Sequence, residues 1–170
     1  MNAEQAKGFL TFFLNNLESE YGVTRKVIAA VPQDKCEYTP DPKSMTARQL
    51  AFHIAGADMF FLDGVINGQF DAPTEEPPAP TKISEILAWH ETNYNDRIAK
   101  LKALPAEKLT KPVNFFGIAE MPAVMFLQFM LMHMSHHRGQ LSTYLRPMGS
   151  KVPSIYGGSA DEPFQMPANA

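Results

Sequence analysis

Four segments of the chain carry apolar side chains at the spacing of an α-helix. Within each segment, residues three or four positions apart are apolar and fall on one face, which is typical of an amphipathic helix. The segments span about residues 2–31, 46–67, 82–104 and 122–146. Pro32, Pro105 and Pro147 end three of them. Because no segment predicts a strand with comparable strength, the pattern indicates an all-α fold, a four-helix bundle.

Short sequence motifs define more closely where the expected helices begin and how they are connected. Thr46 followed by Gln49 is a capping box at the start of the second helix, and Pro122 suits the first turn of the fourth. The connections 68–81 and 105–121 are long enough for a crossover, and "PVNFFG" in the second predicts a short extended piece or a tight turn. We expect one domain over residues 1–170, with an irregular tail at 151–170.

The fourth predicted helix is apolar on nearly every side. Between Pro122 and Leu145 its one charged residue is Arg138. A helix of this kind must be covered on more than one face. We therefore expect a homodimer formed through the fourth helix, with help from the first. The alternative is that the C-terminal tail wraps over the helix.

Composition excludes several classes of protein. Of the 170 residues 19% are charged, the net charge is -3 and the isoelectric point is near 5.9, so a nucleic-acid partner is not expected. Neither a secretion signal nor an apolar run that spans a bilayer is expected, so we predict no membrane partner. The single cysteine, Cys36, agrees with a reducing cytoplasm.

Histidines supply the candidate chemistry. His133 and His137 are four residues apart on the face of the fourth helix that we expect to point inward, and His53 lies on the apolar face of the second. Four-residue spacing stacks two imidazoles on one helix face. A core histidine alone more often bonds a carbonyl or carboxylate, but three buried together need partners. One divalent metal ion would satisfy all three.

Other polar residues are candidates for the surroundings of this site. His90, Tyr94, His136 and Gln140 are expected in the pocket or beside the ligands, with His90 either a fourth ligand or a core histidine. Arg138 is expected on a flank, where it pairs with Asp58 or Asp63 or meets an anionic substrate. Asp58 itself is expected to be solvated or to cap a helix, which leaves the site without an inward carboxylate. No catalytic residue is assigned.

Three stretches resemble a known family. "MTARQLAFHIAGADMFF", "HMSHHRGQLSTYLRPMG" and "VPSIYGGSADEP" are similar to the DinB/YfiT-like family, and the resemblance covers about residues 5–165. It implies a four-helix bundle in up-down-down-up order, often dimeric. It also implies a divalent-metal site on His53, His133 and His137, the same three residues that the helical spacing selects.

Several functions agree with such a site. The resemblance implies a thiol-dependent S-transferase-like activity on a small electrophile, or a metal-dependent hydrolase. A non-catalytic, metal-binding dimeric bundle of a stress response is the alternative from another class. Imidazole ligands suit Zn, Ni, Fe or Cu. The expected cofactors are therefore a divalent metal ion and, for the transferase, a low-molecular-weight thiol, and the expected partner is a small-molecule substrate.

Overall fold

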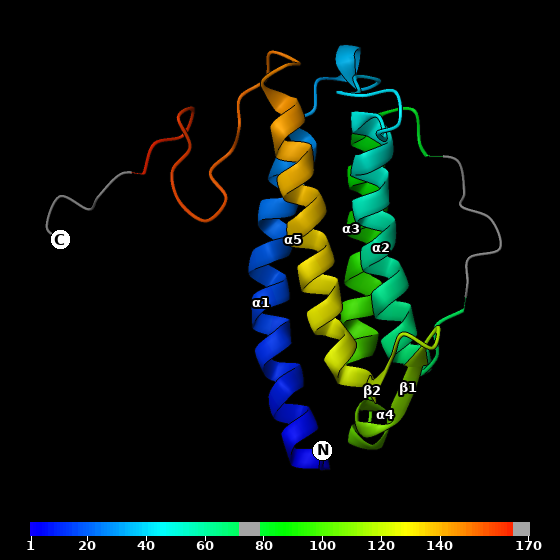
Figure 1. Cartoon of the computed structure of the whole chain (residues 1–170). Helices are drawn as coiled ribbons and strands as arrows, with labels where there is room; N and C mark the ends of the chain where they lie inside the picture. The colour runs from blue at the N-terminus through cyan, green and yellow to red at the C-terminus, as the bar shows by residue number, and fades with distance from the viewer. Residues whose placement is uncertain (72–78, 165–170) are drawn as a thin grey trace, which may run out of the picture.

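The computed structural model describes residues 1–71 and 79–164 (Figure 1). The helices of these ranges are α1 (Ala3–Ala29), η1 (Gln33–Lys35), α2 (Ala47–Asn67), α3 (Ile83–Lys102), α4 (Ala106–Thr110), η2 (Ala123–Met125) and α5 (Phe126–Leu145). Two strands, β1 (Pro112–Phe115) and β2 (Ala119–Pro122), complete the described elements. The long helices α1, α2, α3 and α5 correspond to the four apolar segments, so the expected all-α bundle is confirmed.

Local sequence explains where the first two helices begin. At α1 the Asn2 side chain accepts a hydrogen bond from the Gln5 backbone, and the Gln5 side chain accepts one from the Asn2 backbone. Thr46 and Gln49 make the same reciprocal pair at α2, which confirms the predicted capping box. Gly68 ends α2 with a φ of 74°, a left-handed conformation that glycine adopts without steric penalty.

The four long helices run in up-down-down-up order. Figure 1 shows α2 and α3 both descending from the end of the bundle at which α1 and α5 finish. Contacts between α2 and α3 advance along both helices in the same direction, through the pairs Phe52–Trp89, Asp58–His90 and Asp63–Arg97. The two helices are therefore parallel, and the chain must cross the length of the bundle between them. This confirms the expected crossover. Residues 72–78 of the connection lie outside the described part.

A β-hairpin lies at the end of the bundle where α2 and α3 finish and α5 starts. β1 pairs antiparallel with β2, and Pro112 lies opposite Pro122. The extended piece expected in "PVNFFG" is therefore β1. The prediction that the fourth long helix begins at Pro122 is wrong, because Pro122 belongs to β2 and α5 begins at Phe126. The Ala123 backbone N–H donates to the Lys111 carbonyl, which ties this stretch to the hairpin.

The core consists of two apolar clusters that follow one another along the bundle. Among the described residues, four polar or charged side chains are buried with them: Thr24, Asp58, His90 and Arg138. By length and composition α2 could cross a membrane, but 56% of its apolar window is buried inside the bundle. Packing against α3 and α5 therefore accounts for the apolar character of α2.

The C-terminal tail has no helix or strand over residues 151–164, and residues 165–170 lie outside the described part. Its Tyr156 hydroxyl donates to the Glu20 carboxylate of α1 at 2.8 Å and lies 3.1 Å from the Ser135 hydroxyl of α5. The described tail does not cover all of α5, because Met132 remains 61% exposed.

Candidate metal centre

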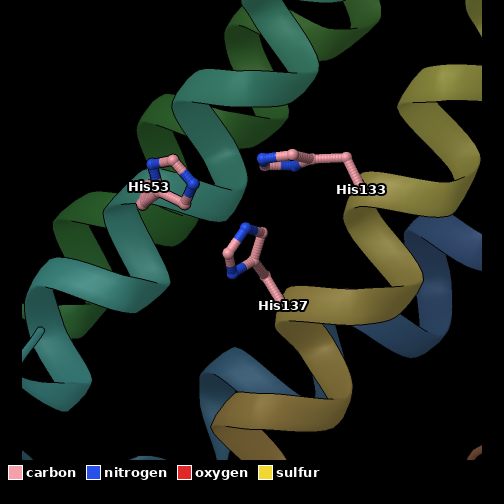
Figure 2. Close-up of side chains that lie close together, drawn as sticks. All are labelled: His53, His133 and His137. Carbon is pink, nitrogen blue, oxygen red and sulfur yellow. The ribbon is translucent and has the colours of Figure 1, made fainter. Parts of the chain in front are cut away.

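Three histidines from two helices converge where α2 meets α5. One ring nitrogen each of His53, His133 and His137 lies within 4.8 Å of the other two. The ring centroids of His133 and His137 are 4.3 Å apart, and that of His53 lies 5.1 Å and 4.6 Å from them. Figure 2 shows the three rings turned toward a common space. The structure thus brings together the three residues that the sequence singled out as ligands.

The donor set fits a divalent transition-metal ion. Two imidazole nitrogens on one ion, each about 2 Å from it, lie no more than about 4 Å apart. The cluster would therefore close by about 1 Å around an ion, a change that small ring rotations supply. All three rings are partly exposed, so an ion can reach them. The group contains no carboxylate among the described residues, which suits Zn, Ni, Fe or Cu better than Mg or Ca.

Gln140 orients one of the rings. Its Oε1 lies 2.9 Å from Nδ1 of His137. An amide oxygen only accepts, so with this amide orientation Nδ1 of His137 carries the proton and donates it. The lone pair of Nε2 is then available for an ion. Metal-bound histidines usually hold their second nitrogen in this way.

His133 is held in its neutral state. Burial, reinforced by the neighbouring His137, His53 and His136, lowers the pKa of His133 to about 4. Its Nδ1 is buried and has no hydrogen-bond partner among the described residues. An unsatisfied buried polar atom costs about 1–3 kcal/mol. A neutral imidazole with a lone pair to share is the form that binds a metal.

Comparison with known proteins identifies the family. Residues 3–165 match the model of the DinB family. The chain belongs to the DinB family. YrdA of Bacillus subtilis is 29% identical over 154 residues, which cover 90% of this chain and 91% of YrdA. YjoA of the same bacterium is 26% identical over 134 residues, with 77% of this chain and 85% of YjoA covered.

Solved structures agree with this assignment. A DinB-like protein from Bacillus cereus superposes with a TM-score of 0.73 at 26% identity, over 85% of this chain and 95% of its own. The DinB-like YjoA of Bacillus subtilis gives a TM-score of 0.67 over 87% and 96%, and at 24% identity it supports the fold alone. The DinB bundle and its three-histidine group are together compatible with metal binding.

The other predicted site residues divide between two places in the DinB bundle. His136 is exposed on α5, with its ring centroid 4.7 Å from that of His137. Tyr94 stacks on Tyr21 between α1 and α3, beside a surface hollow of about 400 Å³. His90 is fully buried and bonds Asp58. Gln140 and His136 thus lie beside the three-histidine group, whereas His90 lies against Asp58 and Tyr94 against Tyr21.

The expectation that Asp58 is solvated or caps a helix is wrong. Asp58 is 1% exposed, and its Oδ2 lies 2.9 Å from Nε2 of His90. Burial raises the pKa of Asp58, and the hydrogen bond from His90 acts in the opposite direction. Asp58 belongs to a second buried row of α2, with Ala51, Ala55 and Leu62, and its contact with His90 places it against α3. Asp58 is thus an inward carboxylate that the sequence reasoning missed.

The expected place and ion-pair partners of Arg138 are also wrong. Its side chain is 1% exposed, and its guanidinium pairs with Glu20 and donates to the Thr24 hydroxyl at 3.2 Å. Asp63 pairs instead with Arg97. The most buried row of α5 runs through Met134, Arg138 and Leu141, with His133 and His137 one residue aside at the edge facing α2.

Proposed function

We propose that this DinB-family protein is a divalent-metal-dependent enzyme that transfers a thiol to a small electrophile. The observation that supports the proposal is the group of three partly exposed imidazoles, which contains no carboxylate among the described residues. A divalent ion held by three such ligands keeps its full charge and an open position, and it lowers the pKa of a water or thiol bound there.

The residues around the histidines have clear tasks in this proposal. His53, His133 and His137 hold the ion, and Gln140 fixes the tautomer of His137. Buried Met130 and Phe61 keep the inner side of the group apolar. This apolar surrounding strengthens the electrostatic interactions of a charged reactant.

The same surroundings favour a thiol over water as the nucleophile. The inward carboxylate of Asp58 is already paired with His90, so it is not free to take a proton from the nucleophile. A thiol ionises with a pKa near 8.5 and water with one near 15.7, so a thiol needs much less help from a base. Hydrolysis at the same site is the second candidate, and it requires a stronger base or a more acidic bound water.

The proposal is tested by measuring turnover of the zinc- or nickel-loaded protein. We expect the loaded protein to catalyse the reaction of chlorodinitrobenzene with a low-molecular-weight thiol in a metal-dependent manner. Without thiol, we expect it to hydrolyse nitrophenyl acetate at a lower rate than that of the thiol reaction. His53→Ala should abolish both reactions, because it removes the ligand from α2. His136→Ala is the matched control, since His136 is exposed and outside the group. Equal turnover by His53→Ala and wild type would contradict the proposal.

We further propose that the enzyme works as a cytoplasmic homodimer on a small-molecule substrate. Phe12 of α1 and Met132 of α5 are 57% and 61% exposed, and a second subunit on these helices would cover such side chains. Light scattering at micromolar concentration should give twice the mass of the chain, and Phe12→Ser should shift the equilibrium toward the monomer. A wild-type monomer at that concentration would contradict the dimer.

A further inference from the structure

A group of phenylalanines extends from the histidine site toward the β-hairpin. We call it the phenylalanine cluster, and its members are Phe60, Phe61, Phe115, Phe116, Phe126 and Phe129. Its link to the site is Phe61, whose ring centroid lies 5.9 Å from that of His133. Phe61 in turn stacks on Phe115 of β1 at 6.1 Å with an interplanar angle of 15°. Rings thus run continuously from a proposed metal ligand to the hairpin.

Part of this cluster lies on the same side of the bundle as the histidines. Phe60 is seven residues after His53 on α2, and Phe129 is four residues before His133 on α5, so each shares a helix face with a ligand. At 1.5 Å per residue these separations are about 10 Å and 6 Å along the helices. Phe60 and Phe129 are both partly exposed. A Cβ atom added at Gly56, between His53 and Phe60, would meet nothing within 4 Å.

Phe116 occupies a backbone position that does not suit it. With a φ of 53° it precedes Gly117, at 74°, in the hairpin turn, which the Ile118 N–H closes onto the Phe115 carbonyl at 2.9 Å. Turns with two positive φ angles favour asparagine or glycine, and a bulky side chain there is strained. Yet Phe116 is 48% exposed, and its ring lies parallel to that of Phe60 at 6.4 Å. Strain of this kind is often kept at functional sites.

We propose that Phe60, Phe116 and Phe129 bind the apolar part of the substrate, and that this part is an aromatic ring or a similarly flat group. The distances along the helices place such a ring about 6–10 Å from the level of the ligands. A sulfur about 2.3 Å from the ion, followed by two carbon atoms, would bring a phenyl ring to the near end of this range. The position of the reacting atom rests on the proposed function. The ring-binding surface itself rests on the phenylalanine contacts.

The experiment compares 2-phenylethanethiol with ethanethiol on zinc-loaded protein by ligand-observed NMR, with zinc content measured on every sample. We expect the wild type to bind the phenyl compound about five- to tenfold more tightly, the preference that one or two good ring contacts supply. Phe116→Asn should remove most of this preference and leave ethanethiol binding and zinc content unchanged. Because asparagine suits the turn, the melting temperature of the Phe116→Asn variant should equal or exceed that of the wild type.

The control and the contrary outcomes separate this inference from the proposed function. Ile118→Asn alters the most exposed large apolar side chain of the same turn and should change neither the preference nor the melting temperature. Equal affinity of the wild type for both thiols, or an unchanged preference in Phe116→Asn, would overturn the inference. A lower melting temperature with weaker binding of both thiols would assign Phe116 a purely structural role and overturn it too. If the wild-type protein bound no zinc and still preferred 2-phenylethanethiol to ethanethiol, only the proposed function would be contradicted.

Discussion

The DinB bundle contains two histidine environments that differ in their partners. His90 lies in the core, fully buried, with its Nε2 on the Asp58 carboxylate. His53, His133 and His137 lie partly exposed between α2 and α5, where their rings neighbour one another and Gln140 contacts one of them. One environment places an imidazole beside a carboxylate, and the other places three imidazoles beside one another.

This difference separates a structural histidine from a candidate ligand. At His90 one ring nitrogen is bonded to a carboxylate within the fold, although its Nδ1 and Asp58 Oδ1 are buried without a partner among the described residues. Burial and the neighbouring imidazoles both disfavour a proton on His133, and together they lower its pKa. A divalent cation would relieve such a cluster, whereas His90 already has a carboxylate beside its Nε2.

The largest effect is expected from breaking the buried pair. Asp58→Leu leaves His90 buried without its hydrogen-bond acceptor, and leaving a buried polar group unsatisfied costs about 1–3 kcal/mol of unfolding free energy, or more if the group is charged. Zinc bound per folded molecule should not change, since Asp58 is outside the three-histidine group. Chemical denaturation and metal analysis of the same samples measure both quantities.

Asp63→Ala is the matched control for this variant. Asp63 also pairs across α2 and α3, with Arg97, but its side chain is 42% exposed. Exposed ion pairs contribute no more than about 1 kcal/mol. If Asp58→Leu proved as stable as Asp63→Ala, the core pair would not have the structural role assigned to it.

A smaller effect is expected at the histidine that Gln140 orients. Gln140→Ala removes the acceptor of His137 Nδ1, and loss of such a contact weakens metal binding about 10- to 100-fold. Stability of the metal-free protein should hardly change. Competition with a zinc chelator measures the affinity, and the exposed Gln128 on the same helix provides the control variant Gln128→Ala. Equal affinities of the two variants would show that Gln140 does not act on the ion.

The smallest effect is a pH dependence of stability in the metal-free protein. His133 has a pKa of about 4 when folded and about 6.5 in the unfolded chain. Between these values the unfolded chain binds a proton that the folded protein refuses, so stability falls as the pH drops from 6.5 to 4. The urea midpoint of wild type should therefore fall more between pH 7 and pH 5 than that of His133→Gln. An identical fall would contradict a depressed pKa.

Much of the fold could be predicted because its signals are local. The apolar spacing located the four long helices, and the Thr46–Gln49 box located the start of α2 within one residue. The hairpin was foreseen only as an extended piece, because its pairing joins Pro112 to Pro122 and depends on contact between two short strands. The helix start expected at Pro122 failed for the same reason.

The site shows the same division between local and tertiary information. His133 and His137 share a helix face by their spacing alone, and the order of the helices then decides that His53 meets them. The burial of Asp58 and Arg138 could not be derived from one stripe per helix. Both α2 and α5 contact two neighbouring helices, so each buries a second row of residues that a single apolar stripe does not include.

The central claim is that the three imidazoles, and not the Asp58–His90 pair, hold one ion. X-ray absorption spectroscopy of the zinc-loaded protein measures the ligands directly. We predict one zinc per chain, with about three imidazole nitrogens at about 2.0–2.1 Å, and loss of this signal in His53→Ala but not in His90→Gln. A spectrum with sulfur or mainly carboxylate ligands, or one that survives in His53→Ala, would contradict the account.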